Sequence, residues 1–302
     1  MGFANDFSYI LRKIEGAEFA TDPFPHLLIE DFFSQEHFSK IINSKQIKLK
    51  KMHRSADLLG ELRELGYKSI DFPGSITSER KYLDYIEKGI FKRSNISGYG
   101  REVIGGYGIT YRLHDYQDEF LGALMSFFES DSLVNLLREK FDITKKTIYE
   151  GGIQKNLKGY EISPHPDTSR KALTWMANIY TDDEPIDKKE MHTHFCQFKS
   201  EYLYVKTFWE YNNVDPVWVP WEWVECVKKT STNNSIVFFK PGFDTLHAVR
   251  VSEDHLVNQR NQIYGNLWYE ESQKKGSASW KKIDLLRKQT RLAKFFYRLG
   301  LI

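Results

Sequence analysis

GGIQKNLKGYEISPHPD, residues 151–167, is the stretch that decides how the rest of this 302-residue chain is interpreted. It predicts a strand with a glycine break that runs directly into His165-Pro166-Asp167. Because residues i and i+2 of a strand point to the same side, we expect His165 and Asp167 to reach one metal ion together. The tripeptide alone is weak support, since a polar pair at a strand end has the same sequence in a chain with nine histidines.

Predicted strands further along the chain supply a second histidine. Residues 235–239 form an apolar run that is typical of a buried strand, and 245–249 form the next strand, which contains His247. Arg260 opens another predicted strand, which extends to residue 269. Two histidines and one carboxylate are the facial triad of non-haem Fe(II) oxygenases, which leaves the other octahedral positions open. The alternative for His247 is a buried histidine that hydrogen-bonds to the backbone.

With these motifs in place, residues 148–269 resemble the Fe(II)/2-oxoglutarate-dependent dioxygenase superfamily, in particular its prolyl-hydroxylase-like branch, and residues 23–33 resemble that family's opening strand. The resemblance implies a mainly β fold with flanking helices (α+β) and a double-stranded β-helix core, also called a jelly-roll or cupin-like core. It also implies that His165, Asp167 and His247 bind Fe(II) as the catalytic centre, with 2-oxoglutarate as co-substrate and O2 as oxidant.

The resemblance further assigns the far carboxylate of 2-oxoglutarate to a basic residue after the distal histidine. Arg260 is the expected anchor, because a planar guanidinium donates two parallel hydrogen bonds to a carboxylate. Arg250 is a rival, since the spacing from His247 to Arg260 is longer than usual, although on a regular strand Arg250 faces away from His247. The alternative interpretation of Arg260 is that it is a cation on the protein surface and binds no co-substrate. Asn156, which replaces a tyrosine of many members, and Thr174 are the other predicted co-substrate-binding residues.

The implied activity is hydroxylation of a substrate C–H bond, coupled to decarboxylation of 2-oxoglutarate to succinate and CO2. The branch favours an amino-acid or peptide substrate, and a sugar or secondary metabolite is left open because selectivity comes from positioning. The alternative from another class is a non-catalytic jelly-roll protein that binds a small molecule or sugar through its tryptophans. Arg260 separates the two hypotheses, since an acid-binding arginine inside the barrel has little purpose without a keto acid.

Length and composition agree with one catalytic domain. A chain of 302 residues buries a large core, and 41% hydrophobic residues exclude a disordered chain. The net charge of +2 gives no reason to expect nucleic acid as a partner. Cys196 and Cys226 make no disulfide framework or zinc cluster, which favours a reducing compartment. Without a recognisable signal peptide, myristoylation motif or membrane-spanning apolar run, the sequence predicts a soluble, cytoplasmic protein.

Residues 1–145 are predicted to contain the N-terminal strand and supporting helices. A short helix is expected at 5–18, and a second one begins after Ser34, which has the side chain of an N-cap. Apolar residues recur at helical spacing from 118 to about 140. The glycine- and charge-rich stretch 45–100 predicts no definite element.

Residues 146–270 are predicted to form the jelly-roll core, with an aromatic-rich insertion at about 183–232 that wedges against the barrel in preference to stacking on a substrate. Within it, His192 and His194 have the spacing of a second metal pair on a strand, but no third ligand stands near them. Residues 271–302 are predicted to be a basic amphipathic helix that packs its apolar face on the domain, in preference to an anionic membrane or partner.

Overall fold

The computed structural model describes residues 6–70, 72, 75–88, 108–181, 191–212, 216, 218–230 and 232–273. Its strands are β1 His26–Ile29, β2 Lys68–Ser69, β3 Thr110–Leu113, β4 Thr147–Asn156, β5 Glu161–His165, β6 Lys171–Asn178, β7 Thr193–Phe198, β8 Val224–Thr230, β9 Ile236–Phe239, β10 His247–Arg250 and β11 Arg260–Tyr269. Its helices are α1 Ser8–Gly16, α2 Gln35–Asn43, α3 Ser55–Glu64, α4 Glu79–Lys88, α5 Glu119–Glu129, α6 Asp131–Lys140, α7 Leu203–Asn212 and α8 Glu270–Gln273, with 3-10 turns at Ser200–Tyr202 and Trp221–Trp223.

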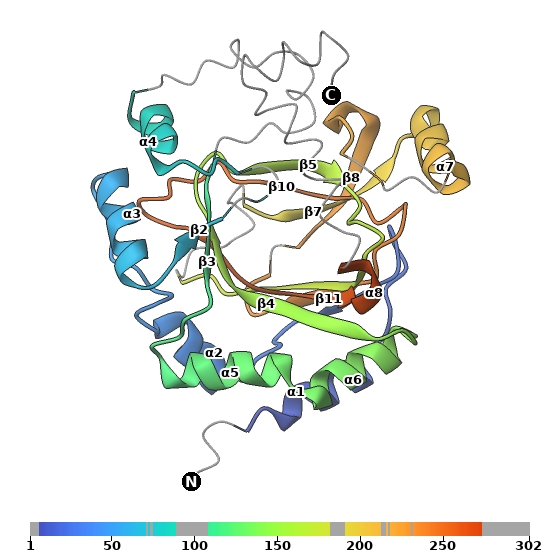
Figure 1. The fold of residues 1–302 in the computed structure, drawn as a ribbon, viewed down its shortest axis with the longest axis horizontal. Coiled ribbons are helices and arrows are strands. Elements are labelled where there is room, and N and C mark those ends of the chain that lie inside the picture. Colours follow the sequence, from blue (N-terminus) through green and yellow to red (C-terminus); the bar gives the residue numbers. More distant parts are fainter. Residues whose placement is uncertain are drawn as a thin grey trace.

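The strands form two antiparallel sheets, one of seven strands in the order β1-β9-β6-β11-β4-β3-β2 and one of four in the order β5-β10-β7-β8 (Figure 1). From β4 to β11 the chain passes repeatedly from one sheet to the other: β4, β6, β9 and β11 belong to the large sheet, and β5, β7, β8 and β10 to the small one. This alternation is the double-stranded β-helix. The predicted fold class is therefore confirmed, and the helices flank the β core.

One of the predicted strands differs from the observed structure. The stretch 151–167 is not one strand, because β4 ends at Asn156 in the large sheet and β5 begins at Glu161 in the small sheet. Gly159 lies in the connecting turn with a φ of 84°, a left-handed conformation that glycine adopts without steric cost. Its N–H donates to the carbonyl of Val251, which fixes the point where the chain changes sheets.

The segment predicted as an insertion contributes two strands to the core. β7 and β8 pair with each other and extend the small sheet, so these two strands are part of the barrel. Among the described residues between them, helix α7 buries Trp209 among apolar side chains on the outer face of the small sheet, as the wedge interpretation requires. Of the predicted C-terminal helix, the structure describes only α8, and the rest lies outside the described residues.

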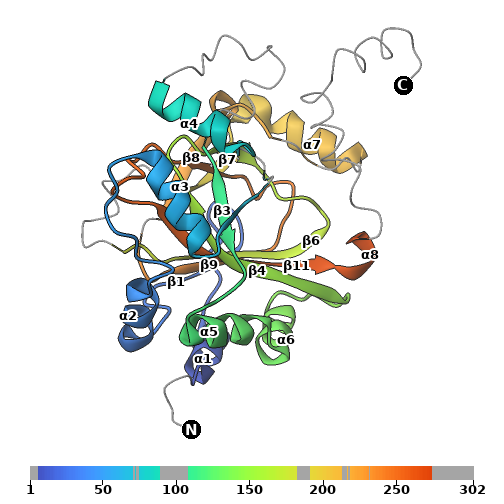
Figure 2. The same ribbon diagram turned by 60° about the vertical axis from the view of Figure 1, so that its left-hand side comes forward.

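Helices α1, α2, α5 and α6 cover the outer face of the large sheet (Figures 1 and 2). Ser34 caps α2 by accepting a hydrogen bond from the N–H of His37, as its position in the sequence predicts. The predicted helical stretch 118–140 is two helices that bend by 44°. Ser130 divides them, because it ends α5 and its hydroxyl caps α6.

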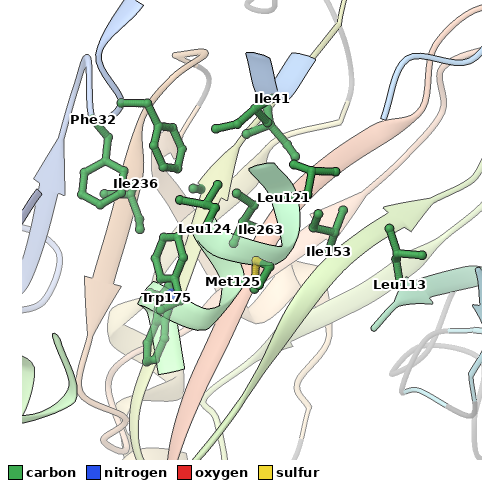
Figure 3. Close-up of a cluster of buried hydrophobic side chains, with 14 of the residues drawn as sticks. Phe32, Ile41, Leu113, Leu121, Leu124, Met125, Ile153, Trp175, Ile236 and Ile263 are labelled. Atoms are coloured by element: carbon green, nitrogen blue, oxygen red, sulfur yellow. The ribbon is translucent and has the colours of Figure 1, made fainter. Parts of the chain in front are cut away.

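Alternate residues of the large sheet point into this helical layer and form the main core (Figure 3). Trp175 of β6 and Ile263 of β11 are fully buried there against Leu121 and Leu124 of α5. Burial of one such side chain stabilises the fold by roughly 1.5–3 kcal/mol. The helices thereby hold the large sheet rigid. The residues between those core positions, including Gln262, point to the opposite face of the sheet, which is the inside of the barrel.

Within the described residues, no single helix is long and apolar enough to span a membrane. Helices α5 and α6 together have enough length and apolar content, but they form a bent pair.

Candidate metal centre and co-substrate site

Three potential metal ligands converge between the two sheets. His165 is the last residue of β5 and His247 the first of β10, and the two are directly opposite in the antiparallel pair, with ring centroids 4.4 Å apart. Asp167 lies in the irregular segment between β5 and β6. One ligand atom from each residue lies within 4.8 Å of the others. The structure therefore brings the predicted residues together, although Asp167 lies two residues beyond the end of β5 and not on the strand face that the H-x-D spacing indicates.

A β-bulge lies directly before His165. The register of β5 and β10 shifts between His247 and Val249, so that Ser163 and Pro164 together oppose one residue. Proline has no N–H to give to a ladder, and it is tolerated here because β5 is an edge strand with an irregular pairing. Bulges of this kind re-aim side chains next to functional sites.

Both histidines are held in the same tautomer. The Nδ1 of His165 lies 2.9 Å from the carbonyl oxygen of Ser163, and the Nδ1 of His247 lies 3.0 Å from that of Thr245. A carbonyl only accepts, so each Nδ1 carries the proton and donates it. The lone pair of each Nε2 is therefore available for a metal ion, which is the arrangement found around metal-ligating histidines.

The third potential ligand, Asp167, is held as a carboxylate. Lys171 Nζ donates to one oxygen of Asp167 at 2.9 Å, and the hydroxyl of Thr174 donates to the other at 2.6 Å. Burial alone raises the pKa of Asp167, but the charge of Lys171 and the neighbouring groups outweigh it and hold the pKa below its usual range. Burial, with the nearby charge of His247, lowers the pKa of His165 to about 3. Two neutral imidazoles and one carboxylate are the protonation states that bind a divalent metal.

Arg260 lies deep in the barrel and is only 1% exposed. Its Nε donates to the Met191 carbonyl at 2.9 Å, one Nη to Asn156 Oδ1 at 2.6 Å and the other Nη to Thr193 Oγ1 at 2.9 Å. These contacts use three of the five N–H donors of a guanidinium, and among the described residues no carboxylate pairs with it. Burial lowers its pKa, because removing the cation from water is costly without a counter-charge. The described residues around Arg260 therefore leave its positive charge without a neutralising carboxylate.

The rival anchor faces the other way. Arg250 is exposed at the end of β10 and donates to both oxygens of Glu161, at 3.1 and 2.9 Å. Its guanidinium lies 4.6 Å from the ring centroid of Trp221, outside the small sheet. The geometry therefore separates Arg250 from the inside of the barrel.

The two other predicted co-substrate residues contact Arg260 and Asp167. Asn156 accepts from Arg260 and donates to the hydroxyl of Thr110 at 3.0 Å. Thr174 donates to Asp167 and lies 3.2 Å from the amide oxygen of Asn266. Both side chains therefore fix the orientation of a predicted site residue.

Sequence reasoning missed several residues of the site. Lys171 has the recognisable signal of a cation four residues after Asp167, whereas nothing local marks Thr193 as a partner of Arg260. Alternate residues of β11 are polar, among them Gln262, whose amide donates to Asn178 at 2.9 Å. Polar residues at every second position of β11 were the signal that one face of this strand lines a polar barrel interior.

The second metal pair receives no support from the described residues. The rings of His192 and His194 are 6.5 Å apart, and the convergent group at His165 is the only set of three or more potential ligands in that part of the chain. His194 instead packs edge-on against Trp221, on the outer face of the small sheet.

Comparison with known proteins gives matches to solved structures alone, since no protein-family profile and no curated sequence matches the chain. A prolyl-4-hydroxylase from Pseudomonas putida is 10% identical, with a TM-score of 0.43, and the match covers 86% of this chain and 98% of that chain. HygX from Streptomyces hygroscopicus, with nickel, 2-oxoglutarate and hygromycin B bound, is 10% identical, with a TM-score of 0.35 and coverage of 82% and 83%.

A third match is a prolyl hydroxylase from Trichoplax adhaerens in complex with a hypoxia inducible factor peptide fragment. It is 12% identical, has a TM-score of 0.35 and covers 76% of this chain and 100% of that chain. At this distance the matches concern the fold, so a functional assignment rests on the side chains of this chain.

Proposed function

We propose that this protein is a non-haem Fe(II)- and 2-oxoglutarate-dependent dioxygenase that hydroxylates its substrate. The observation that carries the proposal is the convergence of His165, Asp167 and His247 within 4.8 Å, with both Nε2 lone pairs available. Two imidazoles and one carboxylate suit Fe(II) and leave positions for a bidentate keto acid and for O2. When bound, the iron would supply the activation of O2.

The residues around the metal ligands have separate tasks in this proposal. Thr174 and Lys171 fix the carboxylate of Asp167, so that one oxygen keeps its direction toward the metal. Phe239 packs its ring 4.9 Å from that of His247 and keeps water from that side of the imidazole.

Arg260 would bind the far carboxylate of 2-oxoglutarate with the N–H groups that its protein partners leave unused. Asn156 and Thr193 hold the guanidinium in place, and burial strengthens its attraction for a carboxylate. The near end of the keto acid would then remain for the metal ion. For the substrate we favour an amino acid or a peptide, on the resemblance of residues 148–269 to prolyl-hydroxylase-like enzymes.

Anaerobic addition of Fe(II) and 2-oxoglutarate tests the proposal without a known substrate. We expect a visible charge-transfer absorbance that needs both components and is absent in the His165→Ala, His247→Ala double variant. If neither compound binds, the chain is instead a non-catalytic jelly-roll protein. If the absorbance forms, turnover of 2-oxoglutarate with amino-acid, peptide and sugar panels identifies the substrate class.

A further inference from the structure

A pair of cysteines lies on the outer face of the small sheet, away from the metal ligands. Cys196 of β7 and Cys226 of β8 are partners in the antiparallel ladder, and their sulfur atoms are 3.1 Å apart. Both are free thiols, Cys196 fully buried and Cys226 exposed. In a disulfide the two sulfur atoms are about 2.0 Å apart, and the two Cβ atoms must face each other. Cysteines at facing positions on neighbouring strands already meet the second condition, so they need little backbone movement to form the bond.

A β-bulge creates this pairing. Phe195 pairs with Lys228, but Cys196 pairs with Cys226, so Val227 is the extra residue of β8. In a regular ladder Val227 would stand opposite Cys196. The bulge therefore brings the second thiol onto the first, as bulges do where a side chain must be re-aimed.

The surroundings make the two sulfurs unequal. The hydrogen bond from Cys196 lowers the pKa of Cys226 below its usual range, and a hydrogen bond from His194 and the charge of Lys229 act in the same direction against partial burial. The same sulfur–sulfur hydrogen bond, together with burial, raises the pKa of Cys196. Cys226 is therefore the sulfur that peroxide can reach and the one whose thiolate is favoured, whereas Cys196 is shielded from solvent.

We propose that Cys196 and Cys226 are a redox-active pair that closes to a reversible disulfide on exposure to hydrogen peroxide. In the first step the thiolate of Cys226 attacks one peroxide oxygen, the O–O bond breaks, and the other oxygen takes up a proton and leaves as water. In the second step the sulfur of Cys196 attacks the sulfenic sulfur and loses its proton, and the S–O bond breaks to release a second water. The two thiols lose two electrons, and one peroxide is reduced to two waters.

The pair is connected to the rest of the barrel through β7. The N–H of Cys196 donates to the carbonyl of Leu246 at 2.9 Å, in the residue before His247. Thr193 of the same strand accepts from Arg260. Closure of the disulfide would link the edge strand β8 covalently to β7, the strand that contacts both Arg260 and Leu246, the residue before His247.

Treatment of the reduced full-length protein with hydrogen peroxide tests the pair, in a buffer with a chelator so that iron takes no part. We expect the intact mass to fall by two hydrogen atoms and peptide mapping to find Cys196 linked to Cys226, with full reversal by a dithiol reductant. The Cys196→Ser variant should accumulate a sulfenic acid on Cys226 that a 1,3-dicarbonyl reagent traps. The Cys226→Ser variant should keep Cys196 reduced, since that sulfur is buried.

Two outcomes would overturn the proposal. One is oxidation of Cys226 to sulfinic acid in the native chain while Cys196 keeps its thiol, which shows a single exposed thiol without a resolving partner. The other is oxidation of Cys196 in Cys226→Ser as fast as in the native chain, which reverses the order of attack. Neither readout depends on Fe(II) or 2-oxoglutarate, so the result is independent of the proposed function.

Discussion

Replacing Arg260 by alanine is the sharpest test of whether the barrel binds 2-oxoglutarate as proposed. The guanidinium is 1% exposed and without a carboxylate partner among the described residues, so a bound dicarboxylate would be its counter-charge. Removing one partner of a buried, hydrogen-bonded ion pair costs about 3–5 kcal/mol. The requirement for 2-oxoglutarate should therefore rise by about 150- to 5,000-fold. Fe(II) affinity should hardly change, because Arg260 contacts none of the three ligands in the structure.

Arg250→Ala is the matched control, since it removes the same side chain ten residues earlier, from a half-exposed position where it pairs with Glu161 outside the small sheet. Because Arg250 contacts Glu161 and Trp221 outside the small sheet, its loss should change the 2-oxoglutarate requirement by less than about tenfold, which corresponds to at most about 1.4 kcal/mol. Titration of 2-oxoglutarate into the Fe(II)-loaded protein without oxygen measures both variants, and thermal unfolding confirms that each is folded. A large effect at Arg250 with none at Arg260 would move the anchor. No effect at either would remove 2-oxoglutarate from the mechanism.

The other predictions concern the metal ligands, their support and acid stability. Single alanine variants of His165, Asp167 and His247 should lose Fe(II) binding while the fold persists, and native 2-oxoglutarate consumption by the His165→Ala, His247→Ala protein would show the assignment to be wrong. Thr174→Val should weaken Fe(II) binding about 10- to 100-fold, measured by metal titration, because it removes the 2.6 Å hydrogen bond to Asp167; Thr174→Ser should retain it. Burial lowers the pKa of His255 to about 4, so between about pH 6.5 and that value the unfolded chain binds a proton that the folded chain does not. This group alone should make the free energy of unfolding fall by about 1.4 kcal/mol for each unit by which the pH decreases in this window. Urea unfolding at several pH values measures it, and an equal dependence on pH in the native and His255→Asn proteins would contradict the prediction.

The sequence by itself determined the local features of this protein. Ser34 marks the start of α2 because its hydroxyl satisfies an N–H group within the next turn. The apolar run 236–239 and the alternating strand 260–269 are recognisable because strand periodicity depends on near neighbours. The same holds for the choice of His165, Asp167 and His247 as residue types with the right chemistry.

The change of sheet within the stretch 151–167 was not predicted, because a glycine break marks a turn without saying that the next strand joins another sheet. The membership of β7 and β8 in the small sheet was also missed, since their residues 193–198 and 224–230 are separated by the segment that contains α7. Each of these outcomes depends on strands far apart in the chain.

Only the tertiary structure decided which distant residues meet. The pairing of β5 with β10 places His247 opposite His165, the burial of β11 puts Arg260 inside the barrel, and the bulge at Val227 brings Cys226 onto Cys196. A shift of one residue in any of these registers would turn the side chains to the opposite face. Register is set by packing against the core between segments that are remote in sequence, and no local pattern contains that information.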